Sequence, residues 1–118
     1  MRAPDAVRDL ARRLAREDAL PAYIYDLTAL DAHAARIRAA LPANVEFYYA
    51  LKANPDPAIV RTITRHADGL EVSSGGELRH AAAAAAGQPL AFGGPGKTPA
   101  ELAAALEASG TSRFHVES

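Results

Sequence analysis

Two lysines stand out among the residues suited to covalent chemistry. The chain has 13 basic residues, and all except Lys52 and Lys97 are arginine. A lysine amine can lose its proton and attack a carbonyl carbon, whereas an arginine guanidinium stays charged and unreactive. Lys52 is flanked by Ala50, Leu51 and Ala53, and we expect this apolar setting to desolvate its amine and favour Schiff-base chemistry. On composition alone, the alternative that the two lysines are present by chance and have no special role carries equal weight.

Other polar or glycine-rich clusters follow the predicted strands. Lys52 comes after the first strand, residues 73–76 after the second and residues 93–97 after the third, while residues 117–118 end the fourth. Ligands of parallel α/β folds bind at the carboxyl ends of the strands. We therefore expect these clusters to share one rim of the molecule and to form its functional site.

Apolar periodicity and capping signals predict the elements that position this rim. Thr28 is predicted to cap the second helix and Asp56 the third, while Thr98 and Glu101 form a capping box for the fifth. The expected helices cover residues 4–16, 28–41, 56–67, 77–86 and 98–108, and the expected strands cover residues 22–26, 45–51, 70–73, 90–92 and 113–117.

From residue 45 onward, strand and helix alternate in steps typical of βα units on a parallel sheet. Both a doubly wound sheet and a (β/α)8 barrel fit this alternation. A complete barrel needs about 250 residues, so on the barrel interpretation the 118 residues are its first half, preceded by an N-terminal helix and a short strand. We expect such a half, with open sheet edges, to be marginally stable and prone to associate.

Composition excludes several other chemistries. Cysteine is absent, which removes disulfides, thiolate metal sites and a cysteine nucleophile. The net charge of −1 gives no basic surplus for binding nucleic acid, and no apolar run is long enough to cross a membrane, so a cytoplasmic location is the default. We expect no metal site, because His33, His66 and His80 lie on predicted helices without ligand spacing. The direction of His115, on the fourth strand, stays open.

Four segments resemble successive motifs of one enzyme family, in order and at the family's spacing. They are residues 49–55 (YALKANP), 69–78 (GLEVSSGGEL), 92–98 (FGGPGKT) and 115–118 (HVES). The family is that of the fold-type III pyridoxal-phosphate decarboxylases, the ornithine, diaminopimelate and arginine decarboxylases. The third motif is closer to the diaminopimelate-like members than to the ornithine enzymes.

The resemblance implies a carboxy-lyase that uses pyridoxal phosphate (PLP) on an amino-acid substrate and forms its active sites in a homodimer. It implies an alanine-racemase-like TIM barrel, with residues 1–20 as an N-terminal helix and residues 21–118 as a partial PLP-binding barrel that stops after strand four. Lys52 would hold PLP as a Schiff base. Glu71 stands where the family often has aspartate, so it would reach toward the cofactor or support Lys52; pairing with an arginine is the alternative. Ser73 and Ser74 are interpreted as helix caps, and Lys97 as a residue that shapes its loop.

The hypothesis that results is the N-terminal part of a diaminopimelate decarboxylase-like enzyme, inactive alone. One alternative is a PLP-binding or regulatory barrel fragment that performs no turnover. Another is a nucleotide-binding loop over residues 91–98 (AFGGPGKT). That loop would need glycine where Ala91 stands, and Pro95 lacks an amide that a phosphate cradle uses.

Overall fold

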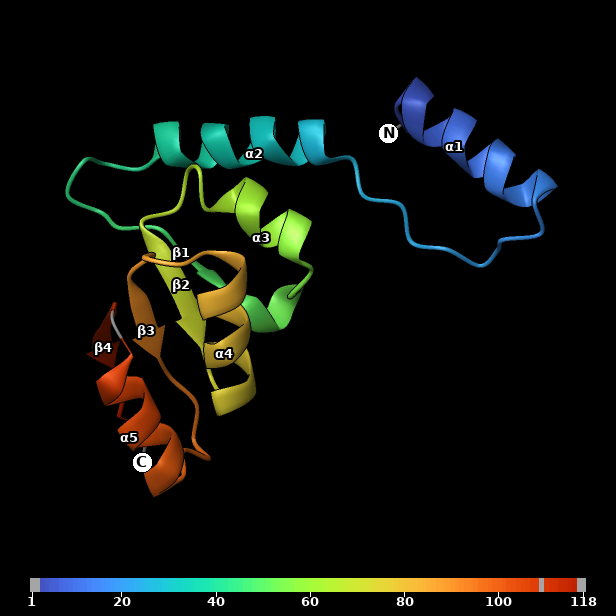
Figure 1. Ribbon diagram of the computed structural model, residues 1–118. Coiled ribbons are helices and arrows are strands. Elements are labelled where there is room, and N and C mark those ends of the chain that lie inside the picture. The colour runs from blue at the N-terminus through green and yellow to red at the C-terminus, as the bar shows by residue number, and fades with distance from the viewer. Residues whose placement is uncertain (1–2, 109, 117–118) are drawn as a thin grey trace.

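A parallel sheet covered by helices on one face forms the body of the protein (Figure 1). The computed structural model describes residues 3–108 and 110–116. The sheet has four strands in the order β1-β2-β3-β4, each parallel to its neighbour. The strands are β1 (Tyr48–Ala50), β2 (Gly69–Val72), β3 (Leu90–Phe92) and β4 (Thr111–Phe114), and the connecting helices are α3 (Pro57–Ile63), α4 (Gly75–Ala84) and α5 (Pro99–Glu107). The predicted α/β class with successive βα units is confirmed.

The core lies between the sheet and these helices. Leu70, Val72 and Phe92 are fully buried and pack against apolar residues of the helices, among them Val60, Leu78 and Ala105. Burial of each such large side chain contributes about 1.5–3 kcal/mol. Side chains alternate between the two faces of a strand, so Glu71 and Ala91, which are paired in register, lie on the opposite face. The helix-free face of the sheet therefore carries Glu71 of β2 and Arg113 of β4, which pairs in register with Ala91.

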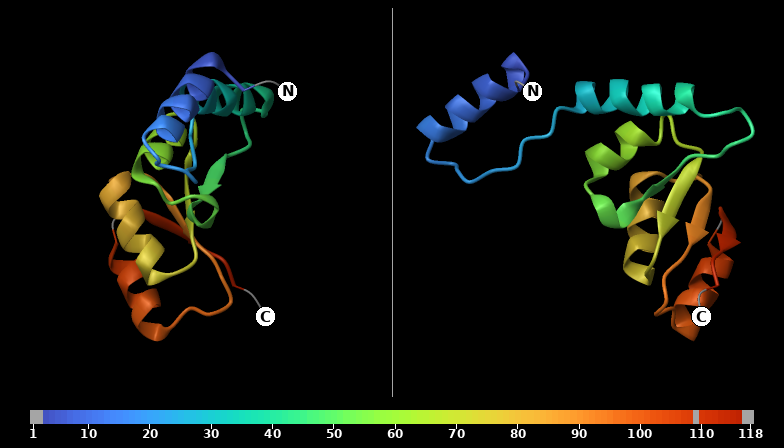
Figure 2. Two further views of the ribbon diagram at one scale, coloured as in Figure 1. Left: turned by 90° about the vertical axis from the view of Figure 1, so that its right-hand side faces the viewer. Right: turned by 180° about the vertical axis from the view of Figure 1, so that it is seen from behind.

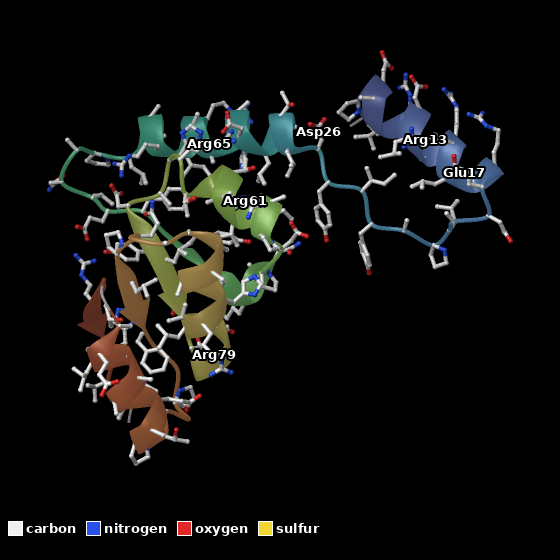
Figure 3. All side chains as sticks on the ribbon, viewed as in Figure 1. Arg13, Glu17, Asp26, Arg61, Arg65 and Arg79 are labelled. Carbon is white, nitrogen blue, oxygen red and sulfur yellow. The ribbon has the colours of Figure 1, made fainter. Side chains whose placement is uncertain are left out.

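The long helix α2 (Leu27–Ala40) begins one residue before the predicted start. Its N-cap is Asp26, whose carboxylate accepts a hydrogen bond from the backbone N–H of Ala29 at 2.9 Å. Figure 3 shows Asp26 at this end of the helix. The predicted cap, Thr28, is wrong, because Asp26 already has the extended backbone of a capping residue and Thr28 lies inside the first turn.

The other capping predictions agree with the structure, with one exception. Asp56 caps α3, with its carboxylate 2.8 Å from the N–H of Ala58, and Thr98 with Glu101 forms the expected capping box of α5. Ser74 caps α4 through the N–H of Glu77 at 3.1 Å. Only Ser74 acts as the N-cap there, because the backbone of Ser73, one residue earlier, instead donates to the Glu77 carboxylate at 2.7 Å.

The N-terminal helix α1 (Asp5–Arg16) lies to the side of the sheet and buries none of its residues (Figures 1 and 2). Residues 17–26 connect it to α2. The strand predicted over residues 22–26 is wrong: these residues form no strand, and Tyr23 is 91% exposed. A strand requires a hydrogen-bonded neighbour, and no described strand pairs with this segment.

Strand β1 is shorter than predicted because side chains replace the strand ladder before it. The carboxylate of Asp68 accepts from the N–H of Phe47 at 2.7 Å, and the guanidinium of Arg38 donates to the carbonyl of Val45 at 3.0 Å. After β1 the chain turns at once into the short 3-10 helix η1 (Leu51–Ala53). Strand β4 begins at Thr111, two residues before the predicted start, and the end of the prediction, residues 117–118, lies outside the described residues. No helix among the described residues is long and apolar enough to span a bilayer.

Candidate functional site

The carboxyl ends of the strands meet at one end of the sheet, where the sequence predicts the site. Lys52 lies in η1, directly after β1, and η1 contacts both β2 and α4. The loops after β2 and β3 also touch: a Cβ placed on Gly94 would lie 3.2 Å from the Ser73 carbonyl oxygen. The structure therefore brings the first three predicted clusters together, as expected of parallel strands.

Lys52 differs from its prediction in one respect. It is exposed, so the expected desolvation of its amine by Leu51 and Ala53 is wrong. The reason is that Leu51 is fully buried in the core and Ala53 is itself exposed, so neither neighbour covers the amine. What the structure offers is an accessible amine on a backbone that is anchored in the core one residue earlier. Such an amine can be reached by a carbonyl compound from solvent.

Glu71 and His115 border the same buried glycine on the helix-free face. A Cβ placed on Gly93 would lie 3.1 Å from Glu71 Oε1 and 3.5 Å from His115 Nδ1. In register, Glu71 stands between Ala50 of β1 and Ala91 of β3. A carboxylate and an imidazole thus stand beside a row of very short side chains, at the end of the sheet that carries Lys52. The absence of a side chain at Gly93 lets the Glu71 carboxylate and the His115 imidazole lie close to the backbone there.

Side chains of Glu46, Tyr48 and Arg113 cover the other end of this face; the backbone of Arg113 lies beside Ala91, and its guanidinium extends toward Tyr48. The Arg113 guanidinium stacks 5.1 Å from the centroid of the Tyr48 ring and forms an ion pair with Glu46. The hydrogen bond that Arg113 donates to Glu46 raises the pKa of Arg113 above its usual range. Gly69 makes room for the Tyr48 ring, which occupies the place of a side chain there. The amino-terminal end of the face is therefore closed by a stacked, charge-paired layer.

This layer also bears on the alternative reading of Glu71 as an arginine partner. Among the described residues Glu71 forms no ion pair, and Arg113, the arginine of the same register row, is paired with Glu46. The carboxylate of Glu71 is thus available at the carboxyl end of the sheet.

Lys97 is used within its own loop. Its ammonium donates to the carbonyl of Gly94 and lies 5.9 Å from the centroid of the Phe92 ring. It also lines a pocket of about 250 Å³ with Phe114 and His115. These contacts agree with the predicted loop-shaping role. They also place the amine away from the position of a phosphate-binding lysine, because it bonds to a carbonyl of the glycine-rich loop.

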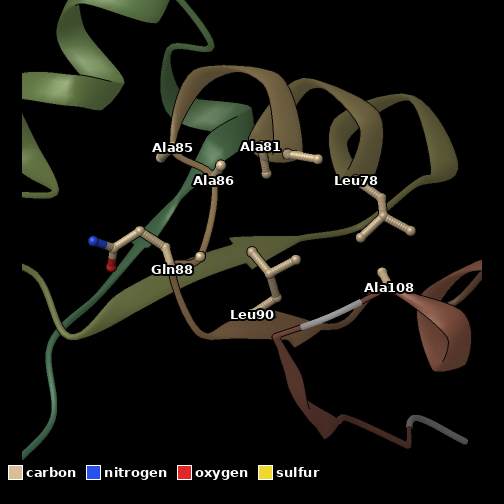
Figure 4. A pocket seen from close by; sticks show the side chains of 9 residues that line it. Leu78, Ala81, Ala85, Ala86, Gln88, Leu90 and Ala108 are labelled. Atoms are coloured by element: carbon tan, nitrogen blue, oxygen red, sulfur yellow. The ribbon is translucent and has the colours of Figure 1, made fainter.

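A second pocket, of about 280 Å³, lies between α4 and α5 (Figure 4). It is lined mainly by apolar side chains, including Leu78, Ala85 and Ala108, and by Leu90 at the start of β3. It therefore opens at the amino-terminal ends of the strands, on the helix side of the sheet, and shares no residue with the site around Lys52. Within the described part of the chain, no three His, Asp or Glu side chains are grouped as metal ligands.

The profile of the pyridoxal-binding domain of pyridoxal-dependent decarboxylases matches residues 27–118. The chain belongs to this decarboxylase family. Its PLP-binding domain is the N-terminal barrel part of an alanine-racemase-like fold, as the sequence predicted, and pyridoxal phosphate is the cofactor of that domain. The exposed Lys52 amine suits an aldehyde, and the Glu71 carboxylate supplies a hydrogen-bond acceptor at the same end of the sheet.

The relatives of this decarboxylase-family chain act on different compounds. It is 45% identical over 96 residues to the 2-[(L-alanin-3-ylcarbamoyl)methyl]-2-hydroxybutanedioate decarboxylase of Staphylococcus aureus, a match that covers 81% of this chain and 24% of the relative. It is 37% identical over 107 residues to the diaminopimelate decarboxylase of Deinococcus radiodurans, covering 90% and 27%. With the Zymomonas mobilis diaminopimelate decarboxylase it shares 34% over 110 residues, covering 89% and 26%. The chain spans about a quarter of the length of these curated relatives.

Three residues of the site were not identified from the sequence. His115 was left open, and its place beside Gly93 follows only from the register of β4 with β3. Tyr49 and His80 bond to the backbone just after Lys52. Tyr49 could have been noticed as a tyrosine within the YALKANP segment, but nothing in the sequence connects His80 to that segment, since its partner lies 25 positions away.

Proposed function

We propose that the protein is a PLP-dependent amino-acid decarboxylase of the diaminopimelate decarboxylase type, in which Lys52 holds the cofactor. The observation that carries the proposal is an exposed lysine at the carboxyl end of β1 in a chain of the pyridoxal-binding family. The relatives named above share the loss of a carboxylate rather than one substrate. The proposed substrate class is therefore amino acids, with diaminopimelate as the first compound to test.

When bound, PLP supplies an electron-withdrawing ring that stabilises the charge left on a substrate carbon after its carboxylate departs. Lys52 would hold the cofactor's aldehyde carbon through its amine, which arginine cannot do. When it is not bound to the cofactor, the Lys52 amine could carry a proton at Nζ. Glu71 would act beside it, as a carboxylate that accepts a hydrogen bond from the cofactor or from the Lys52 ammonium.

Further proposals rest on the family resemblance. We propose a homodimer in which the active sites are completed, a cytoplasmic location, and neither nucleic acid nor a membrane as a partner. We also propose that the chain alone binds PLP weakly and turns over no substrate. In support, the relatives are about four times its length, so most of their residues have no counterpart among those matched.

The decisive experiment compares the chain with the protein encoded by the longest reading frame that contains it. Each is incubated with PLP, reduced with borohydride and digested, and the pyridoxyl-peptides are identified by mass spectrometry; carbon dioxide release from diaminopimelate is measured in parallel. We expect strong labelling of Lys52 and turnover in the longer protein, and weak labelling without turnover in the chain.

Two results would contradict parts of the proposal. Labelling confined to residues other than Lys52 would remove its assigned role. Strong labelling of Lys52 in the longer protein, without carbon dioxide release from any amino acid tested, would favour the non-catalytic PLP-binding alternative.

A further inference from the structure

Tyr49 holds the backbone that follows Lys52. Its hydroxyl donates a hydrogen bond to the carbonyl of Asn54 at 3.1 Å. The ring is half-buried against the core, and this burial raises the pKa of Tyr49 above its usual range, so the hydroxyl keeps the proton that it donates. Tyr49 is thus a fixed donor on β1 that reaches across η1 to the chain beyond it.

His80, on α4, holds the same segment from another element. Its Nε2 bonds to the carbonyl of Pro55. Because a carbonyl oxygen only accepts, the proton of this bond must sit on Nε2. Helix α4 also contacts η1 directly. Pro55 is therefore held by α4, whereas Asn54 is held by Tyr49 of β1.

The remaining backbone around Lys52 is anchored as well. Leu51 is fully buried in the core on one side. On the other side the Asn54 side chain accepts from the N–H of Asp56 at 3.0 Å, and Asp56 caps α3. Between the buried Leu51 and the half-buried Asn54, the Lys52 and Ala53 side chains are exposed. The segment combines a fixed backbone with a freely accessible amine.

From this arrangement we infer that Tyr49 and His80 are positioning residues for Lys52. They restrict η1 to one backbone conformation, so that the amine leaves the chain at a defined point at the carboxyl end of β1. Loss of either contact lets the segment populate other conformations, and the apparent reactivity of Lys52 falls by the fraction that remains competent. The inference rests on the proposed role of Lys52 as the cofactor-holding residue.

The test uses Tyr49→Phe, which removes only the donor, and His80→Ala, with His80→Gln as the conservative variant that keeps a donor. Tyr23→Phe and His33→Ala are matched controls, because both residues are exposed and none of the described hydrogen bonds or ion pairs joins either of them to the Lys52 segment. Two readouts are taken on each chain: hydrogen exchange of the amides of residues 51–56, and the ratio of borohydride-trapped pyridoxyl adduct on Lys52 to that on Lys97 after incubation with PLP. Lys97 is an internal reference, since general destabilisation alters the labelling of both lysines.

We expect Tyr49→Phe and His80→Ala to speed exchange in residues 51–56 and to lower the labelling ratio by about 3- to 10-fold, with exchange in β2 unchanged. His80→Gln should restore most of both readouts, and the controls should leave them unaltered. Faster exchange with an unchanged ratio would overturn the positioning role, as would unchanged exchange in both variants. If the unsubstituted chain and the longer protein both fail to label at Lys52, the proposed function fails instead, and the exchange readout decides by itself whether the two side chains hold the segment.

Discussion

The carboxylate of Glu101, on α5, accepts a hydrogen bond from the backbone N–H of Gly75 at 2.8 Å, in the first turn of α4. The same carboxylate accepts from the backbone and hydroxyl of Thr98 at 3.0 and 2.9 Å. These bonds, that from Gly75 first, lower the pKa of Glu101 below its usual range. One side chain thus completes the cap of α5 and connects it to the start of α4. It fixes the loops after β2 and β3 against each other at the functional end of the sheet.

The first prediction concerns acid stability. A carboxylate with a lowered folded-state pKa stabilises the fold fully above its unfolded-state pKa, about 4.3 for glutamate, and loses this contribution as pH falls through the lower folded-state value. Glu101→Gln should therefore lower the melting temperature at neutral pH and flatten its dependence below about pH 5. Thermal unfolding followed by circular dichroism across this range measures both effects.

The matched control for that experiment is Glu107→Gln, on the same helix at an exposed position. It should leave the curve close to that of the unsubstituted chain. Some acid dependence will persist in Glu101→Gln, because hydrogen bonds from His66 and Arg65 also lower the pKa of Asp31. A gap in melting temperature between Glu101→Gln and the unsubstituted chain that is as large at pH 3 as at pH 7 would contradict the role of the ionised carboxylate.

The second prediction concerns the cap of α4. Ser74→Ala should reduce the free energy of unfolding by about 1 kcal/mol, the usual cost of losing an N-cap side chain. The hydroxyl of Ser74 satisfies the N–H of Glu77, which no carbonyl of the helix can reach. Denaturant unfolding measures the change. Ser73→Ala, one residue earlier, should change it by less than about 0.5 kcal/mol, and equal losses in the two variants would mean that the cap is not the source.

Short-range sequence patterns correctly predicted features that depend only on neighbouring residues, such as helix caps. Thr98 with Glu101 and Asp56 before Pro57 are capping patterns within one turn, and the structure contains both. The bond from Gly75 to Glu101 joins residues 26 apart and depends on how two βα units pack, which no pattern in one sequence shows. The strand predicted over residues 22–26 is wrong for the same reason: a strand also needs a neighbouring strand to pair with, and this segment has none among the described strands. The position of Lys52 was predicted from the order of the elements, whereas its exposure depended on which neighbours face the core.

The third prediction tests Lys52 itself. In the longest protein containing this chain, Lys52→Arg should abolish pyridoxyl labelling at that position and lower decarboxylation by at least about 100-fold, since guanidinium neither condenses with an aldehyde nor transfers a proton. Lys97→Arg is the control, because it keeps a cation beside the Phe92 ring. Absorbance of the bound cofactor and carbon dioxide release measure the two effects. Turnover that survives Lys52→Arg unchanged would mean that another residue holds the cofactor.

The last prediction separates two glycines of the helix-free face by what surrounds them. At Gly69 an added Cβ would lie 2.5 Å from the carbonyl oxygen of Pro89 and inside the Tyr48 ring, and because backbone cannot move aside, Gly69→Ala should cost about 1–3 kcal/mol of stability. At Gly93 the nearest atom is Oε1 of Glu71, at 3.1 Å, on a flexible side chain that can yield.

Gly93→Ala should therefore change the free energy of unfolding by less than about 0.5 kcal/mol. If the cofactor ring binds beside Gly93 and Glu71, the same variant should weaken PLP binding by about 10-fold or more, because the added methyl group and the displaced carboxylate would then occupy the place of the ring. Fluorescence titration of the longer protein with PLP measures the affinity, and Gly96→Ala, at a position with nothing within 4 Å, is the control. Unchanged affinity in Gly93→Ala would place the ring elsewhere on the rim.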